Sequence, residues 1–272
     1  MTVTAGGRTP IATPDPARFA PIPSTDQEDI ATMTATTTST HGLSAPDDRF
    51  ERWRPLVGDE VDVYRRAGFG REAGFGKQPA ILVVDMTYLF VDPDYVVTSG
   101  SGGAEAVRHT AELLAVARRS AVPIFYSKRT DRKHRVGRGA LDYKWSFTSD
   151  EAWLNDPRCD EFPPEIAPHA EDVVVEKTKP SAFFETPLRG MLQFLRVDTL
   201  VTLGISTSGC VRAAVSDAFA CNLRVIVPEE CCFDRSRFAH DANLFDMDMK
   251  FADVDPVETV MDRIASGGPW DG

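Results

Sequence analysis

The thiol of Cys210 is the most reactive side chain that the sequence places at a structured position. An apolar segment, 198–204, leads through a glycine-bounded turn, 204–209, into a helical pattern that begins at Cys210 and continues to 220. A thiol at a helix start faces unpaired backbone N–H groups and the positive end of the helix dipole. This placement predicts a thiol pKa below the usual value of about 8.5, and a thiolate that attacks carbon electrophiles.

Two other residues that carry chemistry also end apolar segments. Asp85 closes the segment 79–85, and Lys177 follows the segment 172–176. Taken singly, the aspartate is typical of a turn, the lysine of a solvated charge and a lone cysteine of a small buried hydrophobe. Taken together, they can perform nucleophilic catalysis, because a carboxylate accepts the thiol proton and a cation stabilises the thiolate.

Apolar segments alternate with helical patterns along the chain. Strands are expected at 79–85, 122–127, 172–176, 198–204 and 223–228, and helices at 50–66, 103–120, 187–196, 210–220, 241–252 and 256–266. Continuous apolar strands between helices are typical of a parallel sheet that is covered on both faces. We predict an α/β fold: a three-layer αβα sandwich around a mainly parallel, six-stranded sheet with Rossmann-like order. The loops at the carboxyl ends of its strands should then meet in one site.

Composition excludes several classes of protein. The chain has 272 residues, 42% of them hydrophobic, and a formal charge of −11 without any Lys/Arg-rich run, so we expect no nucleic-acid partner. No apolar stretch reaches the roughly 20 residues of a membrane helix, and no secretory signal is recognisable, so we expect no membrane partner and a cytoplasmic location. Five cysteines without disulfide spacing indicate reduced thiols.

The first 45 residues differ in composition from the rest. They are rich in Thr, Ala, Pro and Ser and show no hydrophobic period. Such a segment buries too little apolar area to offset its ordering entropy, so we predict a disordered N-terminal extension over 1–45 and one catalytic domain over 46–272. Met33 is an alternative start codon, in which case the native protein lacks residues 1–32.

The chain resembles the isochorismatase-like cysteine hydrolases. The resemblance rests on Asp85, on Lys177 four residues before Ser181-Ala182-Phe183, and on the segment 204–211 that contains Cys210. It extends from about residue 60 to 266 and is strongest to the subgroup with N-carbamoylsarcosine amidohydrolase and maleamate amidohydrolase. The features that indicate this subgroup are Gly68-Phe69-Gly70, Gly74-Phe75-Gly76, Asp234-Arg235 and the segment 242–254. Lys179 is a second candidate lysine, but its distance from Ser181 does not fit the motif.

The resemblance implies roles for the residues that match. Asp85 would be the general base, Lys177 the electrostatic partner and Cys210 the nucleophile. The bond between Ile205 and Ser206 would be a cis peptide, and the backbone N–H groups of Ser206 and Cys210 would form an oxyanion hole.

Substrate binding is implied for three further residues. Arg235 resembles the carboxylate-binding arginine of the subgroup, with the hydroxyl of Thr207 beside it; the alternative for Arg235 is an ion pair with Asp234 or Asp241. Phe90 is a candidate pocket wall or an ordinary core residue. The chain departs from the subgroup at 231–233, Cys-Cys-Phe, where a smaller, glycine-containing segment is expected.

The implied activity is hydrolysis of a linear amide or ureido C–N bond in a small carboxylate, with release of ammonia. N-carbamoylsarcosine is the leading substrate and maleamate the second. An inactive scaffold paralogue and a redox thiol protein are the alternatives, although no Cys-x-x-Cys motif lies near Cys210. The Asp-x-His-x-His pattern of metal-containing nicotinamidases is absent from the sequence, so we expect no metal and no cofactor. The resemblance also implies a homo-oligomer, a dimer or a homotetramer.

Overall fold

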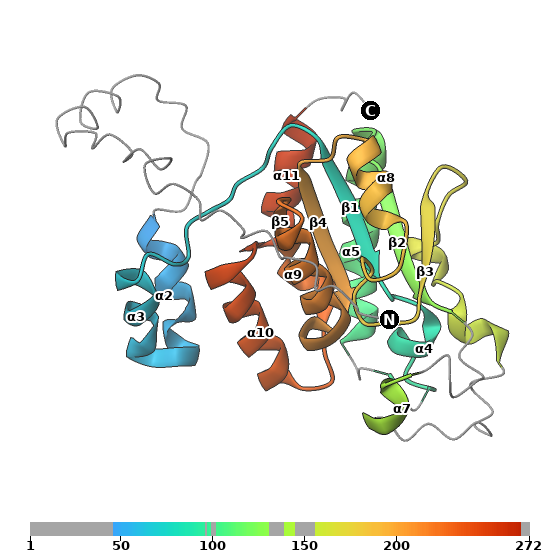
Figure 1. The fold of residues 1–272 in the computed structure, drawn as a ribbon, viewed down its shortest axis with the longest axis horizontal. Helices are drawn as coiled ribbons and strands as arrows, with labels where there is room; N and C mark the ends of the chain where they lie inside the picture. The colour runs from blue at the N-terminus through green and yellow to red at the C-terminus, as the bar shows by residue number, and fades with distance from the viewer. Residues whose placement is uncertain (1–45, 96, 99–101, 131–138, 145–155, 268–272) are drawn as a thin grey trace, which may run out of the picture. The chain divides into compact units, whose positions relative to one another are not determined.

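A parallel sheet forms the centre of the computed structural model, which describes residues 46–95, 97–98, 102–130, 139–144 and 156–267 (Figure 1). The predicted extension, 1–45, lies outside these residues. Seven strands occur in the described part: β1 Pro79–Val84, β2 Ile124–Arg129, β3 Val173–Lys177, β4 Thr199–Ile205, β5 Arg224–Pro228, β6 Cys232–Phe233 and β7 Asp253–Asp255. Their pairings are all parallel. The predicted α/β sandwich is therefore confirmed, with seven strands in place of six.

The sequence pattern does not reveal the short strands β6 and β7. A periodicity needs about four residues to be recognised, and β6 has two and β7 three. β7 also begins and ends with an aspartate, yet it is buried, because Asp253 accepts backbone N–H bonds from Ala73 (3.0 Å) and Gly74 (2.7 Å). Those donors lie about 180 residues away in the sequence, so no local pattern shows them.

The strand order brings the predicted reactive residues to one edge of the sheet. The order is β3-β2-β1-β4-β5-β7, with β6 paired to β4, which is the Rossmann-like order that we predicted. Val84 at the end of β1 lies between Ser127 of β2 and Gly204 of β4. Lys177 ends β3 on the far side of β2. The loops that follow these strands therefore leave the sheet together.

Helices cover both faces of this sheet (Figure 1). α5 and α11 pack together, and α9 packs against α10, as expected when right-handed crossovers leave β1 in both directions. The α-helices are α2 Pro46–Val57, α3 Val61–Arg66, α4 Tyr88–Val91, α5 Gly103–Arg119, α7 Leu141–Lys144, α8 Leu188–Phe194, α9 Arg212–Ala220, α10 Arg237–Lys250 and α11 Val257–Ser266. Short 3-10 turns are η2 Gly58–Glu60, η4 Pro157–Asp160, η5 Pro164–Ile166 and η7 Glu229–Cys231, and η6 Thr207–Val211 is a π-helical turn.

Three predicted helices differ from the observed ones. The helix predicted over 241–252 begins earlier in the structure, because α10 runs over Arg237–Lys250. The helix predicted over 50–66 is interrupted by η2, where Gly58 adopts a positive φ of 59°. The helix predicted over 210–220 begins with the π turn η6, and regular α9 starts only at Arg212. Cys210 therefore lies in a wide turn before the α-helix.

β1 and β4 approach each other closely where they end. Both strands are completely buried. Gly204 has a φ of 122°, and a Cβ atom there would lie 2.2 Å from the carbonyl oxygen of Val84. Only glycine fits this position, and its absent side chain allows the two strand ends to lie side by side.

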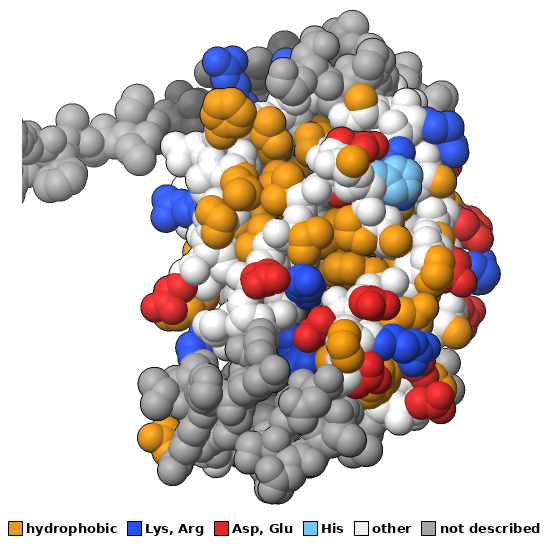
Figure 2. Space-filling model, turned by 90° about the vertical axis from the view of Figure 1, so that its right-hand side faces the viewer, with side chains coloured by type: hydrophobic (Ala, Val, Ile, Leu, Met, Phe, Trp, Pro, Cys, Tyr) orange, Lys and Arg blue, Asp and Glu red, His pale blue; other side chains and the backbone are white. Residues whose placement is uncertain are grey.

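The surface combines apolar and charged side chains. On the face shown in Figure 2, hydrophobic side chains gather over the central part, and charged side chains lie around them. The large apolar side chains with the greatest exposure are Phe194, Tyr143 and Phe238. Within the described residues, no helix is both long enough and apolar enough to span a bilayer.

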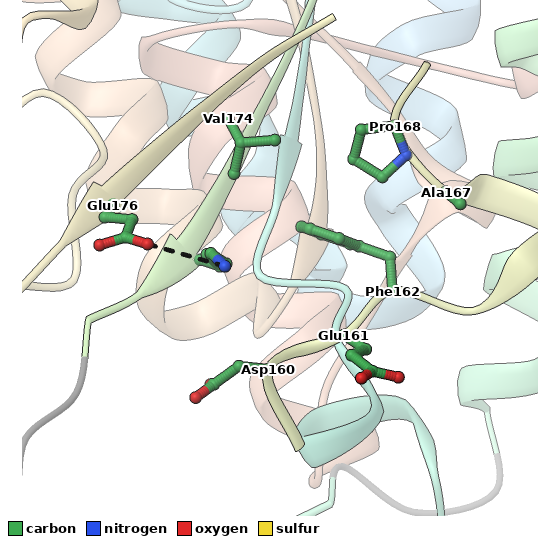
Figure 3. Close-up of a pocket in the computed structure, with 8 residues that line it drawn as sticks. Asp160, Glu161, Phe162, Ala167, Pro168, Val174 and Glu176 are labelled. Atoms are coloured by element: carbon green, nitrogen blue, oxygen red, sulfur yellow. Dashed lines mark ion pairs between the residues drawn. The ribbon is translucent and has the colours of Figure 1, made fainter. Parts of the chain in front are cut away.

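A hollow of about 500 Å³ lies beside the edge strand β3 (Figure 3). Val174 and Glu176 of β3 line it, and Glu176 forms an ion pair with Lys128 of β2 at 3.7 Å. Side chains alternate between the faces of a strand, so these residues point away from the face that carries Lys177. The hollow is therefore separate from the strand-end residues.

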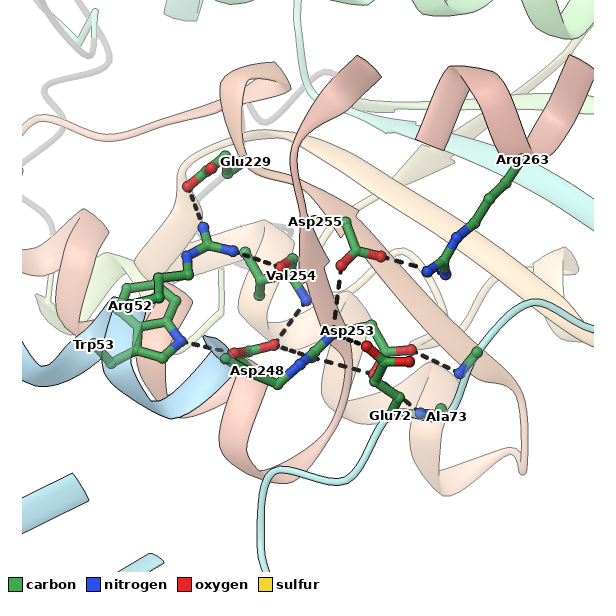
Figure 4. A network of polar contacts seen from close by, with 12 residues as sticks. Arg52, Trp53, Glu72, Ala73, Glu229, Asp248, Asp253, Val254, Asp255 and Arg263 are labelled. Atoms are coloured by element: carbon green, nitrogen blue, oxygen red, sulfur yellow. Dashed lines mark hydrogen bonds and ion pairs between the residues drawn. The ribbon is translucent and has the colours of Figure 1, made fainter. Parts of the chain in front are cut away.

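The N-terminal helix α2 is joined to the rest of the domain through buried charges (Figure 4). Arg49 pairs with Asp248, and with Asp253 and Asp255 at 3.4 Å each. The indole Nε1 of Trp53 donates to Asp248 at 2.7 Å. All three aspartates are buried, and buried carboxylates are costly without a counter-charge. The α2 contact supplies the positive charge of Arg49 to them.

Candidate active site

Asp85, Lys177 and Cys210 meet at the carboxyl edge of the sheet. Lys177 Nζ lies 2.6 Å from Asp85 Oδ2 and 3.5 Å from Cys210 Sγ. The lysine and the aspartate are each 2% exposed, whereas Cys210 keeps part of its surface accessible. The structure thus brings together a carboxylate, an ammonium group and the thiol of a partly exposed residue.

Backbone and side-chain contacts fix the Asp85 carboxylate. Asp85 lies just after β1 in the left-handed region, with a φ of 54°, a conformation that aspartate tolerates better than most residues. Its N–H donates to the carbonyl of Ser127 (3.0 Å), and the Ser127 hydroxyl donates to Oδ1 (3.0 Å). One carboxylate oxygen is therefore bound by Ser127 and the other by Lys177.

The Cys210 thiol does not have the lowered pKa that its place in the sequence predicts. Burial, and after it the negative charge of Asp85, raise the pKa of Cys210 to about 12, while Lys177 acts in the opposite direction. The expectation of a resting thiolate is therefore wrong for this structure. Cys210 lies in the π turn before α9, and Asp85 beside it is a group that can accept the thiol proton.

The turn that carries Cys210 begins at a cis peptide bond. The bond between Ile205 and Ser206 is cis, as the family resemblance predicts. Directly after it, the carbonyl of Ser206 accepts N–H bonds from Gly209 (2.9 Å) and Val211 (3.2 Å). These bonds close the turn around Cys210, so the N–H groups of Ser206 and Cys210 belong to one compact unit.

Arg235 is exposed and lies just after β6. Its guanidinium donates to the carbonyl of Val97, and the part of the chain that the structure describes shows no ion pair between Arg235 and Asp234 or Asp241. Asp241 pairs with Arg237 instead, at 2.7 Å. The charge of Arg235 is thus available to an anionic ligand.

The other two predicted substrate-binding residues have different surroundings. Thr207 is fully buried, and its hydroxyl lies 2.8 Å from Nδ1 of His240. Phe90 is partly buried and packs against the apolar core. These surroundings do not indicate that Thr207 or Phe90 contacts a substrate.

Comparison with known proteins identifies the family. The family model described as the isochorismatase domain matches residues 79–259, from the first residue of β1 into α11. The chain belongs to the isochorismatase family. It is therefore an isochorismatase-family hydrolase.

Two curated relatives and one solved structure illustrate this membership. The chain is 36% identical over 197 residues to maleamate amidohydrolase of Pseudomonas putida, covering 72% of this chain and 91% of that protein. It is 32% identical over 203 residues to N-carbamoylsarcosine amidase of an Arthrobacter species, covering 74% and 76%. The crystal structure of a cysteine hydrolase from Pseudomonas syringae pv. phaseolicola has the same fold, with a TM-score of 0.67, 22% identity and coverage of 73% and 98%.

Three residues contact the isochorismatase-family site although the sequence pattern did not single them out for it. They are Ser127 on Asp85, Asp234 on the Cys210 turn and His240 on Thr207. Burial lowers the pKa of His240, which favours a neutral ring. Ser127 lies opposite Val84 in the sheet register, so strand alternation does not reveal its contact with Asp85. A lone histidine among five likewise carries no signal of its partner.

Two further cysteines lie at and beside β6. Cys231 and Cys232 are buried, and burial raises the pKa of both thiols, that of Cys232 to about 12. Across the residues that the structure describes, no three His, Cys, Asp or Glu side chains lie close enough together to hold a metal ion. The prediction of a metal-free enzyme stays a prediction.

Proposed function

We propose that the chain is a cysteine-dependent amidohydrolase that cleaves a linear amide or ureido C–N bond of a small carboxylate and releases ammonia. The observation that carries the proposal is the position of Lys177 Nζ, 2.6 Å from Asp85 and 3.5 Å from the Cys210 thiol. The relatives named as amidase and amidohydrolase support the bond type.

The first step is attack by sulphur on the carbonyl carbon. Asp85 accepts the thiol proton as the bond from Sγ to carbon forms, and Lys177 stabilises the negative charge on sulphur while the proton leaves. A resting thiol suits this order, because the nucleophile forms only when a substrate is in place. The carbonyl electron pair moves to oxygen, and the N–H groups of Ser206 and Cys210 donate to this oxyanion.

The second step releases ammonia and the third releases the acid. As the oxyanion collapses, Asp85 returns its proton to the departing nitrogen, and an acyl- or carbamoyl-cysteine remains. Asp85, again a carboxylate, then accepts a proton from a water molecule that attacks the carbonyl carbon of this intermediate, and the bond from carbon to Sγ breaks. The thiol regains the proton, so one water is consumed for each ammonia released.

N-carbamoylsarcosine is our first candidate substrate and maleamate the second. Both place a carboxylate a short distance from a carbonyl that bears an NH₂ group. The exposed guanidinium of Arg235, which has no carboxylate partner among the described residues, supports recognition of that anion. The two relatives carry these two substrates in their names.

Replacing the nucleophile tests the proposal. Ammonia release from N-carbamoylsarcosine, other N-carbamoyl amino acids and maleamate should fall by at least about 10⁴-fold in Cys210→Ala. Cys221→Ala is the matched control, because this half-buried cysteine follows α9 at its far end. Retained turnover in Cys210→Ala would refute a cysteine mechanism, and a wild-type protein that hydrolyses none of these amides would favour the scaffold alternative.

Assembly and location remain predictions of the sequence. We propose a homo-oligomer in the cytoplasm, without cofactor, nucleic-acid or membrane partner. Exposed aromatic side chains such as Phe194 and Phe238, which are 85% and 77% exposed, are consistent with self-association. Light scattering of the purified chain measures the assembly directly.

A further inference from the structure

One carboxylate, that of Asp234, joins the loop after β6 to the turn that carries the nucleophile. Its Oδ2 accepts hydrogen bonds from both the backbone N–H and the hydroxyl of Ser208, at 2.7 Å each. Its Oδ1 accepts the backbone N–H of Arg235 at 2.8 Å. Ser208 precedes Cys210 by two residues, so a single side chain holds the backbone of Arg235 and the nucleophile turn together.

In this arrangement the Arg235 guanidinium does not pair with the Asp234 carboxylate in the described residues. Asp234 is occupied by two backbone N–H groups and a hydroxyl, and it forms no ion pair with its neighbour Arg235 in the described residues. The guanidinium extends to the carbonyl of Val97 instead. Asp234 thus fixes the backbone position of Arg235 without neutralising the charge of its side chain.

A second contact from the same segment holds the same turn. His240 lies in the first turns of α10, and its Nδ1 is 2.8 Å from the hydroxyl of the fully buried Thr207. The start of α10 is itself fixed, because the Ser236 hydroxyl accepts the N–H of Ala239 at 3.2 Å. The segment 234–240 is therefore held against the nucleophile turn at two separate points.

We propose that Asp234 is a positioning residue that determines substrate length. It fixes the separation between the carboxylate-binding Arg235 and the sulphur of Cys210. The substrates selected are then small amides whose carboxylate and scissile carbonyl lie one set distance apart. This inference rests on the proposed amidohydrolase function and extends it to the selection among carboxylate-bearing amides.

The test measures kcat and KM for two series of compounds in which only the length changes. One series is N-carbamoylglycine, N-carbamoyl-β-alanine and N-carbamoyl-4-aminobutyrate, and the other is the amic acids malonamate, succinamate and glutaramate. A misplacement of about 1 Å costs on the order of 10²-fold in rate, so wild type should prefer one length by at least about tenfold in kcat/KM. In Asp234→Ala this preference should fall to within about threefold, with the larger loss for the favoured length.

Asp198 provides a matched control at the opposite end of β4. Its carboxylate likewise accepts two backbone N–H groups, from Lys77 (2.7 Å) and Gln78 (3.1 Å), and a hydroxyl, from Thr199 (2.8 Å). Asp198→Ala should lower the melting temperature and leave the length preference as in wild type. If Asp234 had a purely structural role, Asp234→Ala would likewise lower the melting temperature and leave the length preference unchanged.

The outcomes separate this inference from the proposed function. A wild-type enzyme that hydrolyses these amides without a length preference, or an Asp234→Ala variant that keeps the wild-type preference, overturns the role of Asp234 alone. A wild-type protein inactive on every amide refutes the proposed function, and the inference with it. If Asp234→Ala does not fold, Ser208→Ala decides, because it removes only the 2.7 Å hydroxyl bond and should reduce the preference partially.

Discussion

The molecule buries opposite charges in two places, and the two places differ in what they leave accessible. At the strand ends, Asp85 and Lys177 form a buried pair beside Cys210, whose thiol keeps some exposure. At the α2 contact, Arg49 lies among aspartates of α10 and β7, and the indole of Trp53 donates to Asp248 (Figure 4). Buried charge alone therefore does not identify an active site; a reachable nucleophile next to the charge does.

The same physical effect also has different consequences in the two clusters. Burial raises the pKa of Asp248 to about 6, although Arg49 acts in the opposite direction, so this carboxylate reduces stability as it ionises. Burial and Asp85 raise the pKa of Cys210, which keeps a proton available for transfer to Asp85. In the first cluster the charges join elements of the fold, and in the second we propose that they prepare a reaction.

Removing the cation of the strand-end cluster should affect turnover more than removing the cation of the α2 contact. Lys177→Met should lower kcat/KM for ammonia release by about 10³-fold, because the negative charge on sulphur loses its ammonium partner. Lys179→Met is the control: only its backbone carbonyl takes part, accepting a bond from Lys177 Nζ at 3.2 Å. Near-normal turnover in Lys177→Met would mean that the strand-end charge pair is structural, as the α2 contact is.

Removing the cation of the α2 contact should affect stability instead. Arg49→Ala leaves the buried Asp248 without its main counter-charge, so the free energy of unfolding in urea should fall by about 3–5 kcal/mol. Arg263→Ala removes a longer pair with Asp255, at 3.6 Å, and should cost less than about 1 kcal/mol. The folded fraction of Arg49→Ala should keep its kcat. A selective loss of kcat would show that the α2 contact also affects catalysis, and the two clusters would then not differ in role.

A third change should separate proton acceptance from thiol reactivity. Asp85→Asn removes the negative charge that raises the pKa of Cys210 while Lys177 remains. The thiol should then be alkylated by iodoacetamide at pH 8 about tenfold faster than in wild type, although turnover is lost. Mass spectrometry of the modified peptide measures this rate, and a slower alkylation in Asp85→Asn would reverse the assigned electrostatics.

The smallest effect concerns alkaline stability. An unfolded thiol loses its proton near pH 8.5, whereas the folded Cys210 thiol keeps it to about pH 12, so the folded state binds more protons between these values. Stability should therefore fall as pH rises through this window. Cys210→Ala removes this contribution, and its melting temperature should fall less steeply than that of wild type, by about 2–4 °C at pH 10. Parallel curves would show that the thiol is not specifically protected.

The sequence predicts the strand-end cluster because it depends on topology. Asp85, Lys177 and Cys210 each follow an apolar strand, and parallel strands direct their carboxyl ends to one edge. The α2 contact depends on partners about 200 residues apart, such as Arg49 and Asp248, and no periodicity connects them. Local pattern therefore predicts one charged cluster and not the other.

Within the site, the sequence predicts residue types better than their electrostatic state. The position of Cys210 near a helix start suggested a lowered thiol pKa, but burial and the neighbouring Asp85 raise it. Thr207 matched the subgroup as a substrate hydroxyl, yet its hydroxyl lies against His240 in a fully buried position. Such states depend on packing, which a linear motif does not contain.

The close approach of β1 and β4 at Gly204 limits how this family member can diverge. A side chain at this position would meet the Val84 carbonyl at 2.2 Å, and Val84 is the residue before Asp85. Any other residue there would push Asp85, the proposed general base, away from the turn that holds Cys210. A side chain at position 204 would therefore fit only if the ends of β1 and β4 moved apart. The separation of Asp85 and Cys210 thus depends on the absence of a Cβ atom at Gly204.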